Sequence, residues 1–269
     1  MHAYESAFGR ERLAVAQVLL THADLADRVR ANNARDALAA LLDAGAIPIL
    51  NENDSVAVDE IKFGDNDQLA ALVVPLVDAE LLVLLSDVEG VLDARGQRVA
   101  MIHDATEAAA LVRPSKKGGL GTGGMASKIE AARRATLAGA CAVIADAQGE
   151  RVLERIVAAE DVGTLFVRSE LRLSARRYWI AFTLRPRGDV VLDAGAVRAV
   201  RRDNKSVLAV GVLGVRGDFR AGDAVRVLAP EGDEIGRGLA RVAAEDALRM
   251  TGTKSGDNVL VHRDELVVW

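Results

Sequence analysis

The sequence is poor in cysteine and in aromatic residues. It has 269 residues with a single cysteine, Cys141, and aromatic side chains make up 3% of the chain. One cysteine excludes an internal disulfide and a cysteine-rich metal site, and it suits the reducing cytoplasm, where we expect the protein. With so few aromatics, the core has to be built from Ala, Val, Leu and Ile.

Long apolar runs, a signal peptide and an excess of positive charge are also missing. No apolar run reaches the length of a membrane span, and Met1–Glu5 does not begin a signal peptide. The formal net charge of −5 argues against a protein that mainly binds nucleic acid by electrostatics. The four histidines have no spacing typical of zinc ligands, so we expect no metal bound by the protein alone.

A glycine-rich stretch directly before a helix-forming run is the most informative feature present. Residues 118–125 include five glycines, and residues 126–132 favour a helix. Glycine allows close approach of a ligand to the backbone, and a helix N-terminus offers free N–H groups at the positive end of a dipole. We therefore predict a phosphate site, with Lys128 able to reach a transferring phosphoryl group. The alternative is a flexible linker with a solvated lysine, since neither the P-loop nor the GxGxxG spacing fits.

Up to about residue 158, short apolar runs alternate with helical patterns. The predicted strands are 14–20, 47–50, 81–85 and 142–145. The predicted helices are 33–43, 67–77, 105–112, 125–139 and 150–158. This alternation predicts an α/β domain with a parallel sheet, whose ligands bind at the carboxyl ends of the strands.

The pattern changes after about Arg168. A polar, arginine-rich connector contains residues 176–179. Beyond it, turn signals separate short β-type runs at 190–192, 207–212, 224–228 and 259–261. These runs predict a small, mostly-β barrel-like domain. We place the first domain at 1–170, a linker at 171–187 and the second domain at 188–269.

Polar residues stand at the ends of several predicted elements. They are Asn51-Glu52-Asn53-Asp54, Gly64-Asp65-Asn66-Asp67 and Ser86-Asp87. The carboxyl end of a strand is where an α/β sheet builds its site, and amides with carboxylates suit an α-amino acid. The alternatives are an Asx turn, ordinary helix capping and a simple strand-to-turn exit.

Taken together, these motifs resemble one enzyme family. They are Pro48–Asp54, Gly64–Leu69, Leu84–Asp87 and Gly121–Lys128, and the later segments Asp193–Ala196, Lys205–Leu208 and Gly217–Asp223 resemble a PUA domain. The chain is similar to the bacterial glutamate 5-kinases of the amino-acid kinase superfamily over nearly its whole length. The resemblance implies a partial amino-acid-kinase-type parallel sheet with flanking helices, followed by a small, mostly-β PUA-like barrel.

The resemblance also implies an activity, ATP-dependent phosphorylation of the γ-carboxylate of L-glutamate with Mg²⁺, the first step of proline biosynthesis. Asp54 and Asn66 match glutamate-binding positions, and their neighbours Asn51 and Asp67 are further candidates for substrate binding. The nucleotide-binding positions are Ser86, Asp87, Thr122, Gly123, Gly124, Met125, Ala126, Ser127 and Lys128. Lys128 is also the expected transition-state lysine.

Two motifs of the family, a strand ending in Lys-Leu-Gly and a Ser-Gly pair, have no counterpart in residues 1–269. We therefore expect residues 1–170 to be the C-terminal portion of a kinase domain with exposed apolar sheet edges, and to have little activity alone. The parent enzyme is expected to be a homo-oligomer.

Two alternative functions remain at this point. One is a catalytically incompetent fragment with a regulatory role. The other is an RNA-binding module that uses Arg198, Arg201, Arg202 and Lys205. A solvated strand-and-turn face is the simpler interpretation of those four cations in an acidic chain.

Overall fold

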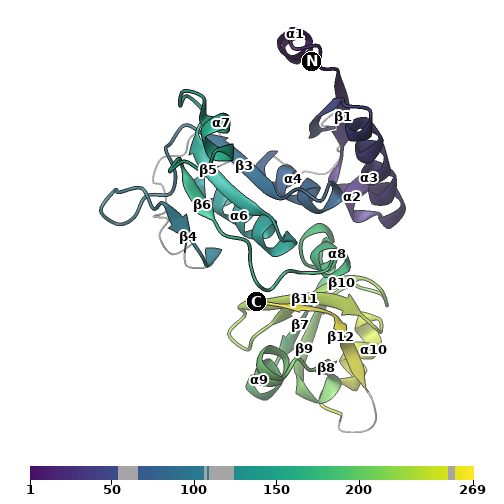
Figure 1. The fold of residues 1–269 in the computed structure, drawn as a ribbon. Coiled ribbons are helices and arrows are strands. Elements are labelled where there is room, and N and C mark those ends of the chain that lie inside the picture. Colours follow the sequence, from purple (N-terminus) through teal and green to yellow (C-terminus); the bar gives the residue numbers. More distant parts are fainter. Residues whose placement is uncertain (54–65, 106–107, 109–123, 254–257) are drawn as a thin grey trace. The chain divides into compact units, whose positions relative to one another are not determined.

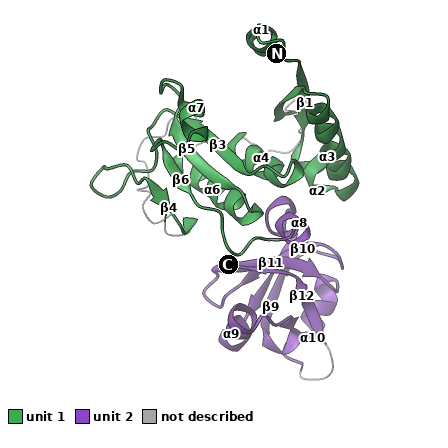
Figure 2. Cartoon of the chain, in the orientation of Figure 1, with its two compact units in different colours: residues 1–173 green, residues 174–269 purple. Residues whose placement is uncertain are grey.

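The computed structural model describes residues 1–53, 66–105, 108, 124–253 and 258–269. The chain divides into two compact units, residues 1–173 and residues 174–269 (Figure 2). The division falls inside the segment 171–187 that was predicted to be a linker, and the domain limits at 170 and 188 stay predictions. Each unit has its own hydrophobic core, so the two are described separately.

The described part of the first unit contains two sheets (Figure 1). Strands β1 and β2 form a parallel pair, and a second sheet has the order β3-β5-β6-β4. β3 is parallel to β5 and β4 is parallel to β6, whereas β5 and β6 are antiparallel. The strands are β1 Val15–Leu20, β2 Ile47–Glu52, β3 Leu81–Ser86, β4 Met101–Ile102, β5 Cys141–Asp146 and β6 Thr164–Phe166. The predicted α/β class is confirmed, with an antiparallel junction that the sequence pattern did not indicate.

The helices of the first unit begin and end at residues suited to those positions. Asp27 accepts hydrogen bonds from the backbone N–H groups of Val29 and Arg30 and so caps α3. Gly139 ends α6 with φ of 101°, a left-handed conformation that favours glycine. The helices are α1 His2–Gly9, α2 His22–Ala26, α3 Arg28–Asp43, α4 Asn66–Val73, α6 Met125–Ala138 and α7 Val152–Val157. Most of the predicted helix 105–112 lies outside the described residues.

Helix α6 packs on the sheet through alanine side chains. Ala131, Ala132 and Ala135 are fully buried and share a core with Ala142 and Ile144 of β5. The 14 residues of α6 span about 21 Å and the six residues of β5 span about 20 Å. Because a short turn joins the two elements and they run in opposite directions, the start of α6 lies level with the carboxyl end of β5.

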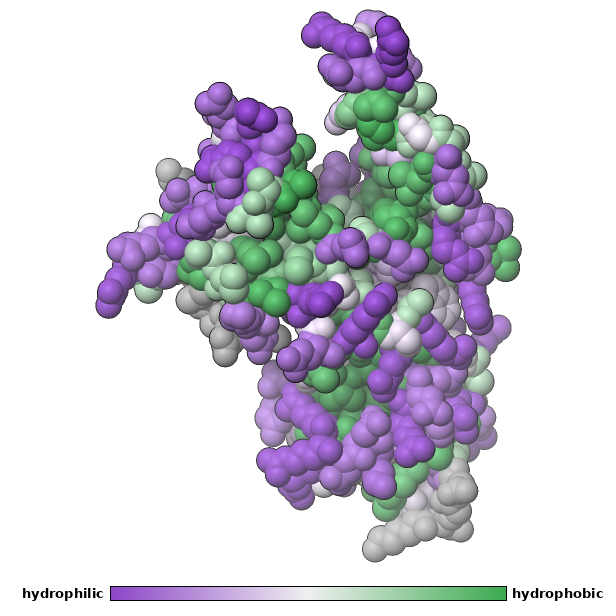
Figure 3. All heavy atoms as spheres, in the orientation of Figure 1, coloured by the Kyte–Doolittle hydropathy of each residue, from purple (hydrophilic) through white to green (hydrophobic). Residues whose placement is uncertain are grey.

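Strand β3 forms an edge of its sheet in the part of the chain that the structure describes. Leu81 and Leu85 of this strand keep 37% and 42% of their surface exposed, and Leu19 of β1 keeps 44%. Apolar surface is visible over this unit in Figure 3. An apolar edge with free backbone groups is a template for pairing with another strand.

The second unit is a curled six-stranded sheet with short helices (Figure 1). The strand order is β8-β12-β11-β10-β7-β9, in which only β7 and β10 pair in parallel. The elements are α8 Ala175–Tyr178, β7 Gly188–Leu192, α9 Ala194–Asp203, β8 Val207–Leu208, β9 Val212–Gly217, β10 Ala224–Leu228, β11 Glu234–Ala240, α10 Ala244–Met250 and β12 Val259–Val268. Phe219, Val225 and Ile235 are among its fully enclosed core residues. The prediction of a small, mostly-β domain is confirmed.

The predicted continuous strand 207–212 is wrong, because a turn interrupts it. A 3-10 turn at Ala209–Gly211 separates β8 from β9. This turn lies against α9, where a Cβ on Gly211 would come 2.5 Å from the Cβ of Ala196. The carbonyl of Gly211 accepts the backbone N–H of Asp193 at 2.9 Å. The close approach of α9 therefore accounts for both the turn and the glycine.

Two arginine-rich segments also differ from their sequence interpretation. Residues 198–202 lie on helix α9, not on a strand and turn. Residues 176–179 form helix α8 and the start of a π-helical turn, Trp179–Thr183, not a polar connector. Tyr178 and Phe182 are buried there, and Phe182 stacks on Trp269 with ring centroids 6.4 Å apart, so aromatic packing joins this segment to the end of the second unit. None of the helices in the described ranges is long and apolar enough to cross a membrane.

Candidate active site

The start of α6 is where the glycine-rich stretch predicts an anion site, and this site stays a prediction. Gly124 occupies the N-cap and has no side chain that could cap the first turn. Gly124 and Ala126 are exposed, while Met125, Ser127 and Lys128 are partly buried. An uncapped helix N-terminus attracts phosphate through these N–H groups and the helix dipole. Thr122 and Gly123 lie outside the described residues.

Lys128 is held in place by a carboxylate on a different helix. Its Nζ lies 2.8 Å from Oδ2 of Asp67, in the first turn of α4. Each side chain keeps only 13% of its surface exposed. The ammonium group is therefore fixed beside the start of α6, where it can neutralise an anion bound by the helix.

A second contact joins the residue after Asp67 to the residue before Lys128. Nε2 of Gln68 donates to the backbone carbonyl of Ser127 at 3.1 Å and to its Oγ at 3.2 Å. Helices α4 and α6 are neighbours in the structure (Figure 1). Sequence reasoning did not identify Gln68, and its position directly after Asp67 was the available signal.

The carboxyl ends of β3 and β5 lie at the same edge of the sheet. Ser86 pairs with Asp146 in the parallel register, and its carbonyl accepts the N–H of Ala147 at 2.8 Å. The hydroxyl of Ser86 donates to Oδ1 of Asp87 at 3.2 Å, and Asp87 is exposed. The start of α6 lies at this level of the sheet, so the structure brings the predicted nucleotide pair and the helix N-terminus to one edge.

The predicted substrate residues lie on two other elements. Asn51 is exposed near the end of β2, and Asn66 is exposed at the first position of α4. β2 and α4 contact each other. Asp54 falls outside the described residues. The structure therefore pairs Asp67 with Lys128, places Asn66 directly before Asp67 in α4, and places Asn51 on a strand that contacts α4.

Glu130 is not suited to proton transfer, although it lies one turn beyond the site. Burial raises the pKa of its carboxyl. Hydrogen bonds from Arg133 and Arg134, each with an Nε at 2.8 Å, lower this pKa by more than burial raises it. The net effect keeps the pKa of Glu130 below its ordinary value, so the side chain stays ionised at neutral pH.

No cluster of three or more metal-ligating side chains occurs among the described residues. A Mg²⁺ ion that enters with a nucleotide takes most of its ligands from phosphates and water and only one or two from protein carboxylates. Asp67 already bonds Lys128, and Asp87 is the exposed carboxylate at the same edge of the sheet.

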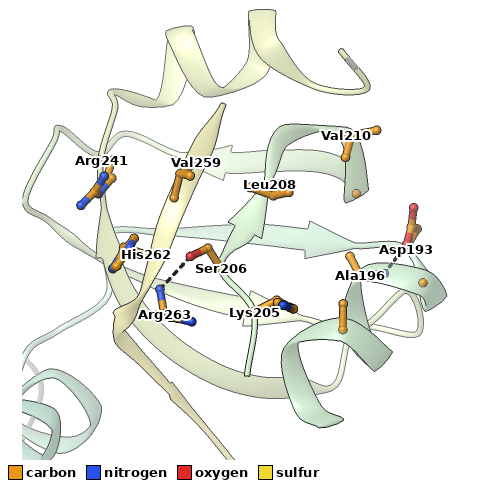
Figure 4. Close-up of a pocket in the computed structure, with 13 residues that line it drawn as sticks. Asp193, Ala196, Lys205, Ser206, Leu208, Val210, Arg241, Val259, His262 and Arg263 are labelled. Atoms are coloured by element: carbon orange, nitrogen blue, oxygen red, sulfur yellow. Dashed lines mark hydrogen bonds between the residues drawn. The ribbon is translucent and has the colours of Figure 1, made fainter. Parts of the chain in front are cut away.

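The second unit contains a separate pocket of about 840 Å³ between α9, β8 and β12 (Figure 4). Its ionisable lining residues are Asp193, Lys205, Arg241, His262 and Arg263. Asp193 caps α9 by accepting the N–H of Ala196 at 2.7 Å. Lys205 and Arg241 are exposed. The pocket therefore has a mainly cationic rim.

Comparison with known proteins matches each unit to a family. Residues 1–146 match the amino acid kinase family, and residues 188–261 match the PUA domain. Glutamate 5-kinase of Pseudomonas putida is 45% identical over 284 residues, which cover 100% of this chain and 76% of the relative. Glutamate 5-kinase of Citrifermentans bemidjiense is 42% identical over 288 residues with the same coverage. The chain belongs to the glutamate 5-kinases of the amino acid kinase family.

Proposed function

We propose that the protein transfers the γ-phosphoryl group of ATP to the γ-carboxylate of L-glutamate. The observation that carries this proposal is the Lys128–Asp67 ion pair beside the start of α6, where the N-cap residue Gly124 has no side chain. It fixes a cation next to a phosphate-binding helix end, and phosphoryl transfer depends mostly on positioning and charge neutralisation.

On the nucleotide side, the first-turn N–H groups of α6 and the ammonium of Lys128 face the transferring group. They stabilise the negative charge that spreads over its equatorial oxygens in the transition state. Ser86 and Asp87 at the end of β3 contact the nucleotide. Mg²⁺, bound mainly through the phosphates, supplies further positive charge when it enters with ATP.

On the acceptor side, Asn66 and Asp54 bind glutamate, with Asn51 as an additional contact. The carboxylate of Asp54 is a partner for the α-ammonium group, and the amide of Asn66 donates to a carboxylate. Asp67 acts differently, because its oxygen holds Lys128. These substrate roles rest on the family resemblance and on the position of Asn66 next to Asp67.

The transfer needs no general base. A γ-carboxylate is already ionised near neutral pH, so one of its oxygens bonds to the γ-phosphorus without losing a proton. The bond between that phosphorus and the bridging oxygen breaks, and ADP leaves with the electron pair. The products are glutamate 5-phosphate and ADP. This reaction is the first step of proline biosynthesis.

The test offers glutamate, aspartate, N-acetylglutamate and UMP in parallel with ATP and Mg²⁺, and it measures ADP and acyl phosphate. Two proteins are assayed, namely residues 1–269 and a fusion that adds the part of the P. putida kinase with no counterpart here, about a quarter of that kinase. The active form is whichever of these two proteins phosphorylates an acceptor. We expect glutamate to be its preferred acceptor. Preference for another acceptor, or inactivity of both forms beside an active P. putida control, would overturn the assignment.

We also propose that the second unit contacts RNA through the cationic pocket. Lys205, Arg241 and Arg263 surround it, and phosphate contacts by such residues make binding depend on salt. RNA bound to residues 174–269 is expected to dissociate as the salt concentration rises, and Lys205→Gln with Arg241→Gln is expected to weaken binding. Affinity that does not change with salt or with these substitutions would contradict the proposal.

Two further features stay predictions. The first is a homo-oligomeric assembly, which light scattering on the purified protein measures directly. The second is a cytoplasmic location, which agrees with a single cysteine, Cys141, that is free in the structure.

A further inference from the structure

Two consecutive residues of α4 contact two consecutive residues of α6. Asp67 bonds Lys128, and Gln68 bonds Ser127. The partners are 61 and 59 positions apart in the chain, so these side chains connect the substrate-side helix to the nucleotide-side helix. The Asp67 contact fixes the ammonium group of Lys128. The Gln68 contact can fix the first turn of α6, which carries that ammonium group.

The chemistry of Ser127 determines which way the Gln68 amide points. A backbone carbonyl only accepts hydrogen bonds, so the group 3.1 Å from it is the amide nitrogen. The amide oxygen then points elsewhere, and it is buried without a hydrogen-bond partner in the described structure. A buried acceptor of this kind is unfavourable, so the bonds of Nε2 do not make Gln68 an optimised stability contact.

The bond to Ser127 is not needed to build α6. Ser127 is the third residue of a 14-residue helix, and its carbonyl is already within reach of the N–H four residues later. A second donor on this carbonyl adds little to helix formation. It does fix where the first turn of α6 lies relative to α4, and Lys128 follows Ser127 directly.

We propose that Gln68 is a positioning residue for phosphoryl transfer. It holds the first turn of α6 so that the Lys128 ammonium and the first-turn N–H groups face the same phosphoryl group. Small displacements of such groups reduce the rate far more than they reduce ground-state binding. The inference rests on the proposed kinase function and deepens it.

The first experiment compares Gln68→Met with Gln68→Glu in the active form. Methionine keeps the side-chain length and removes the donor, so kcat is expected to fall about tenfold with less than a twofold change in the KM for glutamate. The control is Gln17→Met on the exposed face of β1, which should leave kcat unchanged. An unchanged kcat in Gln68→Met would overturn the proposal.

Gln68→Glu separates positioning from packing through its pH dependence. The introduced carboxylate cannot donate to the Ser127 carbonyl, whereas the protonated carboxyl can. Because a glutamate side chain ordinarily has a pKa of about 4.3, its kcat relative to wild type is expected to recover severalfold from pH 7 to pH 5, and the ratio for Gln68→Met should stay flat. Asp67 and Lys128 are the charged groups beside position 68, and both are common to all three proteins. Flat ratios for both variants would contradict a donor role.

Hydrogen exchange tests the same contact without activity. In ligand-free protein, Gln68→Met is expected to raise amide exchange over residues 127–131 about tenfold and to leave β5 unchanged. Ser127→Ala, which keeps the carbonyl bond and loses the Oγ bond, should have less than a threefold effect. If no form phosphorylates glutamate, the kinase assignment fails while this readout still decides whether Gln68 fixes the turn. Unchanged exchange in Gln68→Met would overturn that role.

Discussion

Replacing Lys128 with alanine is expected to lower kcat by about a hundredfold or more, which is the size of effect seen when one preorganised electrostatic contact is removed. The ammonium group is held 2.8 Å from Asp67 beside the start of α6, so its charge meets the phosphoryl group where negative charge develops. Because this interaction acts mainly in the transition state, the KM for glutamate should change little. Steady-state kinetics of the active form with glutamate and ATP measure both quantities.

The control for this substitution is a lysine of the second unit, which contains none of the candidate active-site residues. Lys205→Ala removes an exposed lysine of the second unit and should leave kcat for glutamate as it is. A Lys128→Ala variant with wild-type turnover would show that the residue is only part of a structural ion pair. A variant that loses glutamate affinity at constant kcat would place Lys128 in substrate binding instead.

Local sequence signals predicted the elements that carry the site. The apolar run 81–85 became β3, and the helix-forming run before Gly139 became α6 within one residue of its predicted bounds. Both signals are local, since one is continuous apolarity and the other is helix propensity ended by a glycine.

Pairing and turns that depend on distant residues were not predictable. The antiparallel contact of β5 with β6 depends on the chain returning at Thr164–Phe166, a three-residue strand too short for a clear pattern. The break in 207–212 depends on α9 packing against Gly211. In both places a tertiary contact decides the local structure, which a single-sequence pattern does not contain.

The candidate site likewise combines residues that local sequence motifs predicted with contacts that only the tertiary structure shows. Sequence motifs placed Asp67 and Lys128 at the starts of two helices, but the ion pair between them appears only once α4 and α6 are neighbours. The role of Asp67 in substrate binding stays a prediction, since its described partner is Lys128. Gln68 lies within the Gly64–Leu69 motif, which assigned it no role, and its contact with Ser127 is what distinguishes it.

Replacing Asp67 with asparagine or alanine is expected to lower kcat at least tenfold, with the larger loss in the alanine variant. Asparagine keeps an oxygen that accepts from the Lys128 ammonium, whereas alanine leaves the charge unpaired in a site where 13% of each side chain is exposed. Breaking a buried pair from one side costs about 3–5 kcal/mol, so Asp67→Ala should also lower the free energy of unfolding of the first unit. Urea denaturation and steady-state kinetics measure the two effects.

A double-variant cycle decides whether Asp67 acts through Lys128. If the carboxylate only positions the ammonium, Asp67→Asn combined with Lys128→Ala should be no slower than Lys128→Ala alone, because the group being positioned is already gone. The stability loss should follow the same rule, since removing both partners leaves no unpaired buried charge. Rate losses that multiply in the double variant would mean that Asp67 contacts glutamate, ATP or Mg²⁺ independently of Lys128.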